Sequence, residues 1–199
     1  MYKVIFWDFD GVILDSNEIR TNGFREVLKK YPVEKVEELI LYHKINGGLS
    51  RYVKFRYFFE NILQRQINET EILLLSKSFS DIVIQKLKDP KLLIESTHNF
   101  IRKNYNNYKM FIVSGSDGVE LRKICKFLNI DKYFLKIEGS PTDKTTLVND
   151  ILVKYNFNSN ECILVGDSIN DFNAATENRI HFMGIGEVNL VNKSNSLLF

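Results

Sequence analysis

Four short segments of the sequence combine acidic, hydroxyl and basic side chains with free backbone N–H groups. The residues concerned are, in chain order, Asp8, Asp10, Ser114, Gly115, Lys144, Asp167 and Asp171. Paired carboxylates are costly to bury unless a cation or a proton compensates them, and carboxylate oxygens are ligands that suit Mg²⁺. A hydroxyl, backbone N–H groups and an ammonium group can together hold an oxyanion or a phosphate. In combination, these residue types favour a divalent cation beside a phosphate.

The first two segments also have structural interpretations. The acidic pair in DFDGV follows an apolar run, and a capped or acidic turn is the alternative to catalysis there. Gly11 lets the backbone turn sharply at this point. The segment IVSGS ends a second apolar run in the same way. It could form a phosphate cradle, or a plain turn with a helix N-cap at Ser116 or Asp117.

The other two segments have similar alternatives. In GSPTDKTTL, Thr142 or Asp143 could cap a helix, which places Lys144 in the first turn, where a positive charge opposes the helix dipole. A solvated lysine is the alternative to a phosphate partner. In ILVGDSIND, Asp167 and Asp171 follow an apolar run and suit Mg²⁺, although Asp171 could also be a helix cap.

The elements that must position these residues are short buried strands. Apolar runs occur at 4–7, 110–113, 162–165 and 180–183, with a further strand expected at 133–137. Helical periodicity lies between them, for example at Leu121, Ile124 and Leu128. Strands that alternate with helices predict an α/β fold: a three-layer, Rossmann-like parallel sheet. Ligands of such sheets bind at the carboxyl ends of the strands, where the four segments lie.

One long stretch interrupts this alternation. Residues 16–87 contain helical apolar stripes and no strand pattern. We therefore predict a catalytic core made of residues 1–15 and 88–199, and a helical insert made of residues 16–87. Connections in such folds are usually short, so an insert of this size directly after a strand favours a functional role.

Composition narrows the class of partner. The 199 residues include 27 Lys or Arg and 25 Asp or Glu, giving a net charge of +2 that favours neither nucleic acid nor a membrane surface. Cys125 and Cys162 lie in apolar stretches and are interpreted as small core residues. The first apolar run is too short for a signal peptide, so we expect a cytoplasmic protein. We also expect a monomer or homodimer.

In this order, the four segments resemble the haloacid dehalogenase-like hydrolase superfamily. The resemblance covers residues 3 to 185 and is to phosphatases with a small helical cap, the group of phosphoglycolate phosphatase and β-phosphoglucomutase. It implies that Asp8 is the nucleophile and takes the phosphoryl group. It implies that Asp10 is the acid for the leaving alcohol and then the base for water. A small phosphorylated metabolite is the implied substrate.

The resemblance also implies a ligand set. Mg²⁺ would be held by the carboxylates of Asp8 and Asp167 and by the backbone carbonyl of Asp10. Asp171 would be a further ligand or would orient Lys144. The phosphoryl oxygens would be bound by Ser114, by the backbone at Gly115 and by Lys144.

The insert is expected to select the substrate. Arg51 follows a glycine pair in NGGLSR, and its counterpart in the resembling mutases faces the active site; a solvated helix face is the alternative. Arg20, at the start of the first helix of the insert, is a second candidate. Some mutases of the group have histidine where this sequence has Arg20. Its absence here favours a phosphatase over an intramolecular sugar phosphomutase. A phospho-accepting signalling domain is disfavoured, because such domains lack a helical insert.

Overall fold

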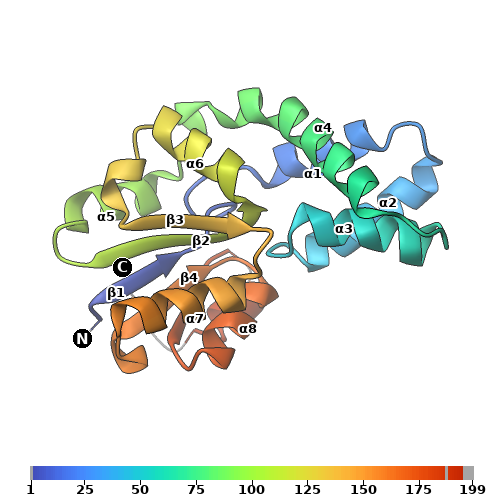
Figure 1. Ribbon diagram of the computed structural model, residues 1–199. Helices are drawn as coiled ribbons and strands as arrows, with labels where there is room; N and C mark the ends of the chain where they lie inside the picture. Colours follow the sequence, from blue (N-terminus) through green and yellow to red (C-terminus); the bar gives the residue numbers. More distant parts are fainter. Residues whose placement is uncertain (1, 187, 195–199) are drawn as a thin grey trace.

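The computed structural model of the chain describes residues 2–186 and 188–194. Its centre is a sheet of five parallel strands in the order β3-β2-β1-β4-β5 (Figure 1). The strands are β1 Val4–Trp7, β2 Lys109–Asp117, β3 Lys136–Ser140, β4 Cys162–Gly166 and β5 His181–Gly184. The predicted Rossmann-like α/β sheet is confirmed.

Helices cover both faces of this sheet. On one face lie α5 Glu95–Asn104 and α6 Gly118–Phe127, and on the other lie α7 Lys144–Tyr155 and α8 Ile169–Glu177, with α9 Val188–Val191 after the last strand (Figure 1). Side chains of a strand alternate between faces. Ile5 and Trp7 therefore join the apolar cluster of α5 and α6, while Val4 and Phe6 join that of α7 and α8.

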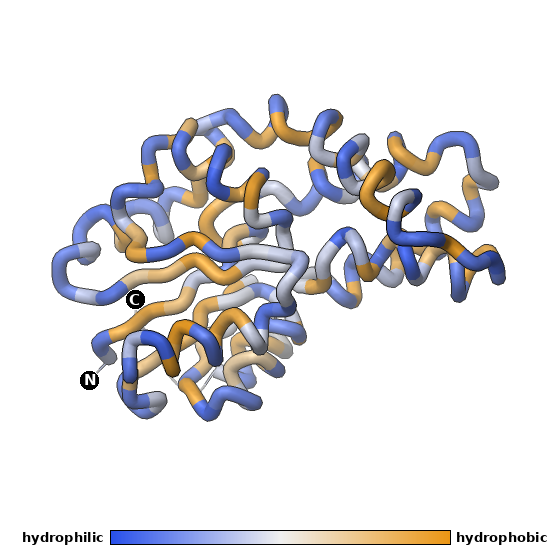
Figure 2. The backbone as a smooth tube through the Cα atoms, in the orientation of Figure 1, coloured by the Kyte–Doolittle hydropathy of each residue, from blue (hydrophilic) through white to orange (hydrophobic). Residues whose placement is uncertain are grey.

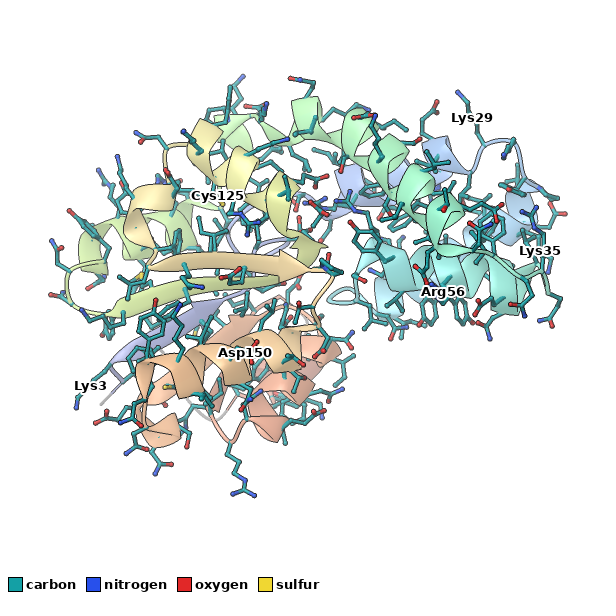
Figure 3. All side chains as sticks on the ribbon, in the orientation of Figure 1. Lys3, Lys29, Lys35, Arg56, Cys125 and Asp150 are labelled. Carbon is teal, nitrogen blue, oxygen red and sulfur yellow. The ribbon has the colours of Figure 1, made fainter. Side chains whose placement is uncertain are left out.

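Burial explains why the strands are continuously apolar. All four residues of β1 and all five of β4 are buried, because both strands lie inside the sheet with helices on each face. Figure 2 shows these strands as hydrophobic and the outer faces of the helices as largely hydrophilic. Charged side chains such as Lys3, Lys29 and Asp150 project outward and are exposed (Figure 3).

Residues 16–87 hold four α-helices and a π-helical turn, which extend away from the sheet beyond the carboxyl ends of its strands (Figure 1). These are α1 Asn17–Val27, α2 Val33–Ile45, α3 Arg51–Tyr57, the π turn Phe58–Ile62 and α4 Glu69–Leu87. They pack around their own aromatic centre, in which Phe24 lies 4.7 Å from Phe79 and 5.3 Å from Phe55 between ring centroids.

The strand expected at 133–137 is displaced in the structure. A 3₁₀ turn occupies Asp131–Tyr133, and β3 begins only at Lys136. Ladder pairing starts where Leu135 N–H donates to the Met110 carbonyl at 2.8 Å, because residue 133 is still bonded within its turn. Both cysteines are buried and free, as predicted. In the described part of the chain, no helix combines the length and hydropathy needed to cross a membrane.

Candidate active site

The turn after β1 brings the first acidic pair to the sheet edge. Asp8 N–H donates to the Val165 carbonyl at 2.9 Å, which extends the pairing with β4 by one residue and buries Asp8 to 3% exposure. Gly11 has φ +77°, which favours glycine. A Cβ atom there would lie 1.9 Å from Asp167 Oδ2. The glycine therefore permits the close approach of the β1 turn to the acid that follows β4.

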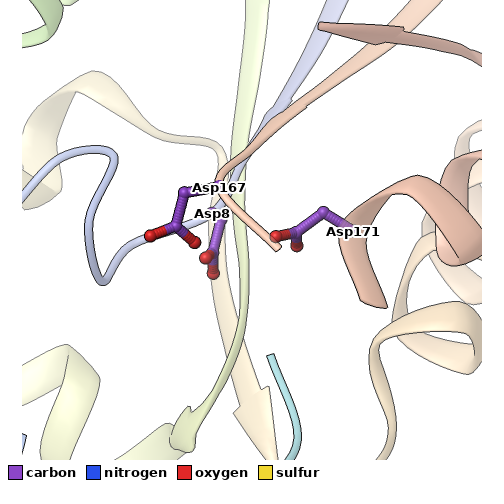
Figure 4. A group of neighbouring side chains, drawn as sticks. All are labelled: Asp8, Asp167 and Asp171. Carbon is purple, nitrogen blue, oxygen red and sulfur yellow. The ribbon is translucent and has the colours of Figure 1, made fainter. Parts of the chain in front are cut away.

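Three carboxylates meet at this edge. Asp8 and Asp167 follow neighbouring strands, and Asp171 points toward them from the first turn of α8 (Figure 4). One oxygen of each can be chosen so that all lie within 4.8 Å of one another. Burial raises the pKa of Asp8 well above its usual range and that of Asp167 to about 6. The negative charge of Asp171 is the second cause in both cases.

Lys144 is the cation that faces this cluster. Asp143 caps α7 by accepting from Thr146 N–H at 2.9 Å, which places Lys144 in the first turn, as predicted. Its Nζ lies 2.8 Å from Asp8 Oδ1 and is bonded to Asp171. Burial opposes ionisation of Lys144, but Asp171 and Asp8 outweigh it and raise the pKa of the ammonium group.

This charge balance fits a divalent cation. One ammonium group faces three carboxylates, and among the described residues the hydrogen-bond partner of Asp167 is a neutral amide, Asn17 Nδ2 at 3.0 Å. Asp171 also belongs to the capping box of α8: Ser168 is the N-cap, and Asp171 in the first turn accepts from Ser168 N–H at 3.0 Å. The two interpretations of Asp171, acidic site residue and cap, are therefore compatible. Closely spaced carboxylate oxygens are the donor set expected for a hard divalent ion.

The end of β2 supplies the neutral donors. Ser114 is 1% exposed, and its Oγ accepts from Ser116 N–H at 3.1 Å. The ladder to β3 is irregular between Ser114 and Asp117, where the chain turns into α6. Asp117 caps that helix, accepting from Val119 N–H at 3.0 Å. Asp117 is thus the helix cap that the sequence offered as an alternative, and Ser114 and Gly115 lie at the end of the strand next to β1.

Asp10 is held by three donors. Its Oδ1 accepts from Arg20 Nε at 2.8 Å and from the Ser16 hydroxyl, and its Oδ2 accepts from the Ser116 hydroxyl at 2.5 Å. Burial would raise the pKa of Asp10, but the Arg20 guanidinium and the two hydroxyls outweigh it and lower the pKa. This carboxyl group is thus an ionised acceptor in the structure.

The two arginines of the insert meet a buried acid of the core. Glu120, on α6 and 3% exposed, accepts from Arg20 Nη1 at 2.6 Å and from Arg51 Nη1 at 2.9 Å. Ser80, on α4, donates to the same carboxylate at 2.6 Å. Next to it, Tyr52 donates to Asp117 Oδ2 at 2.6 Å. These contacts join the insert to the core beside the acidic cluster.

A cavity of about 970 Å³ lies between the insert and the strand ends. Its lining includes all but two of the predicted site residues: Asp8, Asp10, Arg20, Arg51, Ser114, Gly115 and Asp167. Lys144 and Asp171 lie behind this wall, in contact with Asp8 and with each other. The cavity is large enough for a small phosphorylated metabolite.

Sequence reasoning assigned no role at this site to three of its polar residues. Glu120 gives no signal in the sequence, because an acid in the first turn of a helix is already explained by its favourable interaction with the helix dipole. His43 and Lys54 form a buried pair in the insert, with Lys54 Nζ 2.9 Å from His43 Nδ1. The spacing of His43 from Val36, Leu39 and Ile40 is typical of the apolar face of a helix, which indicates burial but no partner.

Comparison with known proteins finds relatives of the kind that the sequence motifs resemble. A curated 5′-nucleotidase of Pseudomonas aeruginosa is 21% identical over 192 residues, covering 93% of this chain and 83% of that protein. The structure of β-phosphoglucomutase from Clostridium difficile superposes with a TM-score of 0.79 at 16% identity, covering 100% of this chain and 91% of that one.

A structure described as a predicted phosphoglycolate phosphatase, from Haemophilus somnus, gives a TM-score of 0.70 at 18% identity, covering 92% and 84% of the two chains. At these identities the structural matches show the fold. The family model described as haloacid dehalogenase-like hydrolase matches residues 4–185. The match spans the sheet, residues 16–87 and the acidic cluster, and the chain belongs to the haloacid dehalogenase-like hydrolase family.

Proposed function

We propose that the protein is a Mg²⁺-dependent phosphatase that hydrolyses the phosphomonoester of a small metabolite. The observation that carries this proposal is the position of Asp8. Its carboxylate lies 2.8 Å from the Lys144 ammonium group, belongs to the three-acid cluster and lines the cavity. A carboxylate so placed can attack a phosphorus atom, while a lysine and a hydroxyl bind the phosphoryl oxygens.

The reaction would proceed in two displacements. An Asp8 oxygen bonds to phosphorus as the ester P–O bond breaks, and the leaving oxygen takes a proton from Asp10. To supply that proton, Asp10 has to leave its contact with Arg20 and become protonated when substrate binds. Water then attacks phosphorus, Asp10 accepts its proton, and the bond between phosphorus and Asp8 breaks. Each step is a substitution at one phosphorus atom, so residues that position it and stabilise its oxygens supply most of the catalysis.

The residues present would hold the metal with Asp8 and Asp167, together with the backbone carbonyl of Asp10. When bound, Mg²⁺ offsets the repulsion between the phosphate and the carboxylates and stabilises charge on the phosphoryl oxygens. Asp171 keeps Lys144 charged and directed at Asp8. Ser114 and the backbone at Gly115 complete the proposed phosphate site.

We further propose that residues 16–87 act as a cap over this site. The loop between α2 and α3 comes very close to Gly115 in the proposed phosphate site. A Cβ atom on Gly115 would lie 2.2 Å from the Gly48 carbonyl oxygen. Arg20 and Arg51 fix the neighbouring helices to Glu120. A closed cap excludes water from the first displacement and places side chains of the insert against the leaving group.

Phosphate release from a panel of metabolite phosphates, measured with Mg²⁺, tests the proposal. Asp8→Asn should reduce release by at least about 1000-fold on every substrate, because the amide is no nucleophile. Asp150→Asn, an exposed change on α7, is the matched control and should leave the rate unchanged. Undiminished activity of Asp8→Asn would refute the mechanism, and an isomerised sugar phosphate in place of free phosphate would identify a mutase.

A further inference from the structure

Lys54 is a buried cation of the insert that has no acidic partner among the described residues. It lies on α3, is 3% exposed and lines the cavity shared with Asp8. Its Nζ bonds to His43 Nδ1 at 2.9 Å and to the Gly47 carbonyl at 3.1 Å. Both are neutral acceptors, because burial and the Lys54 charge lower the pKa of His43 to about 3.

Among the described residues, the other buried cations in and beside this cavity are paired. Arg20 and Arg51 share Glu120, and Lys144 bridges Asp8 and Asp171. A buried ammonium group without a counter-ion destabilises a fold unless something else uses its charge. Burial lowers the pKa of Lys54 to about 7, although the charges of Asp10 and Asp8 act in the opposite direction without touching it. An anion entering the cavity would supply a direct partner and restore the charge.

A second unused donor lies in the same cavity. Nη2 of Arg20 is buried and has no hydrogen-bond partner in the described structure, and Arg20 lines the cavity as Lys54 does. Arg20 comes from α1 and Lys54 from α3, so donors from two helices of the insert are available to one ligand. The transferred phosphoryl group itself has Lys144 and Ser114 on the core side.

We propose that Lys54 determines specificity by binding a second anionic group of the substrate, a carboxylate or a phosphate, remote from the phosphoryl group transferred to Asp8. The inference rests on the proposed phosphatase function and adds the class of its substrate. The cavity of about 970 Å³ has room for both groups. The phosphoryl group would lie at the strand ends and the second anion against the insert.

Matched pairs of ligands test this proposal. In each pair the transferable phosphate is the same and the second group is either charged or neutral: 3-phosphoglycerate against glycerol 3-phosphate, and glucose 1,6-bisphosphate against glucose 1-phosphate. Wild type should prefer the charged member of at least one pair in kcat/KM, and the pair that responds identifies the anion as carboxylate or phosphate. Absence of preference in both pairs overturns the proposal without any variant.

Lys54→Met should reduce that preference by about 10- to 100-fold, the usual range for a charge-assisted hydrogen bond. Lys54→Gln tests the same loss of charge with a polar side chain. Lys44→Met removes an exposed lysine from the cavity rim and should leave the preference within about 2-fold, because water screens its charge. A purely structural Lys54 would lower kcat/KM equally for both members of a pair, which would refute the inference.

Binding measurements separate this inference from the proposed function. Calorimetric titration of Asp8→Asn with each pair reports affinity without turnover. If wild type releases no phosphate but Asp8→Asn still binds the charged member more tightly, the anion site stands and the phosphatase proposal fails. If phosphate is released with equal efficiency from both members, the phosphatase proposal stands and the role of Lys54 is refuted.

Discussion

At the scale of single residues, the site depends on how its buried charges are paired. Glu120 forms ion pairs with two arginines from different helices. Its carboxylate lies 2.6 Å from Arg20 and 2.9 Å from Arg51. Removing one partner from such a buried network destabilises the fold, because the remaining charged groups are left without compensation. The arginines expected to contact substrate therefore also hold the insert on the core.

Glu120→Gln should destabilise the fold by about 3–5 kcal/mol, because two buried guanidinium groups lose their shared counter-ion and keep only Asp10 and the more distant Asp117. Urea unfolding followed by circular dichroism measures this loss. Asp81→Asn breaks a pair with Lys77 in which both side chains are more than half exposed, and should cost less than about 1 kcal/mol. Equal losses in the two variants would mean that the Glu120 cluster contributes no more than a surface pair.

Lys54 should give the folding free energy a distinctive pH dependence. Its pKa is about 7 in the folded chain, mainly through burial, against about 10.4 when unfolded. Between these values the unfolded chain binds a proton that the folded chain lacks, so stability rises with pH, by at most about 1.4 kcal/mol per unit. Below pH 7 the cost of the buried charge is fully present.

Urea unfolding between pH 7 and 10, compared with Lys54→Met, isolates this contribution because the other groups titrate in both proteins. The wild-type stability should rise relative to the variant across this range. Parallel pH profiles for the two proteins would show that the ammonium group keeps its ordinary pKa and has a counter-ion in solution.

At the scale of elements, the strand ends were predictable and the helix contacts were not. Asp8 and Asp167 could be placed together because both follow apolar runs, and parallel strands end at one edge of a sheet. Glu120 could not be placed, since α6 meets the insert through tertiary packing that no local pattern records. Lys54 reads as one of three basic residues after a glycine pair, and its burial depends on how α3 packs.

The glycine pair illustrates what an element contributes to the site. A Cβ atom on Gly48 would lie 2.8 Å from Ser168 Oγ, whereas on Gly47 its nearest neighbour would be at 3.4 Å. Gly48→Ala should push the loop off the core and lower kcat/KM by about 10- to 100-fold, because small displacements of positioned groups are costly in rate. Gly47→Ala should keep most of the activity.

Thermal unfolding of both alanine variants should show a folded protein, which assigns the loss of activity to loop position. Similar activity in the two variants would indicate that the loop does not need to approach Ser168 during turnover. The comparison is sharp because the two residues are adjacent and only one of them contacts the core closely.

At the scale of the whole molecule, the core and the insert meet at a cluster of like charges. Asp8, Asp167 and Asp171 repel one another, and Asn17 of the insert contacts this cluster through Asp167 at 3.0 Å. Burial and this repulsion together raise the pKa of Asp8 and Asp167, so a cation that binds there stabilises the folded chain. We therefore expect metal binding at this cluster to be coupled to the junction between the two parts.

Mg²⁺ should raise the melting temperature of wild type and leave that of Asp167→Asn unchanged. At 100 times its dissociation constant, a ligand of the folded state adds about 2.7 kcal/mol, which corresponds to about 5–10 °C for a chain of this length. Metal-free Asp167→Asn should be at least as stable as metal-free wild type, because one of three like charges is gone. Asp143→Asn, which keeps a good cap for α7, should respond to Mg²⁺ as wild type does. An identical Mg²⁺ response in Asp167→Asn would place the ion elsewhere and remove Asp167 from the ligand set.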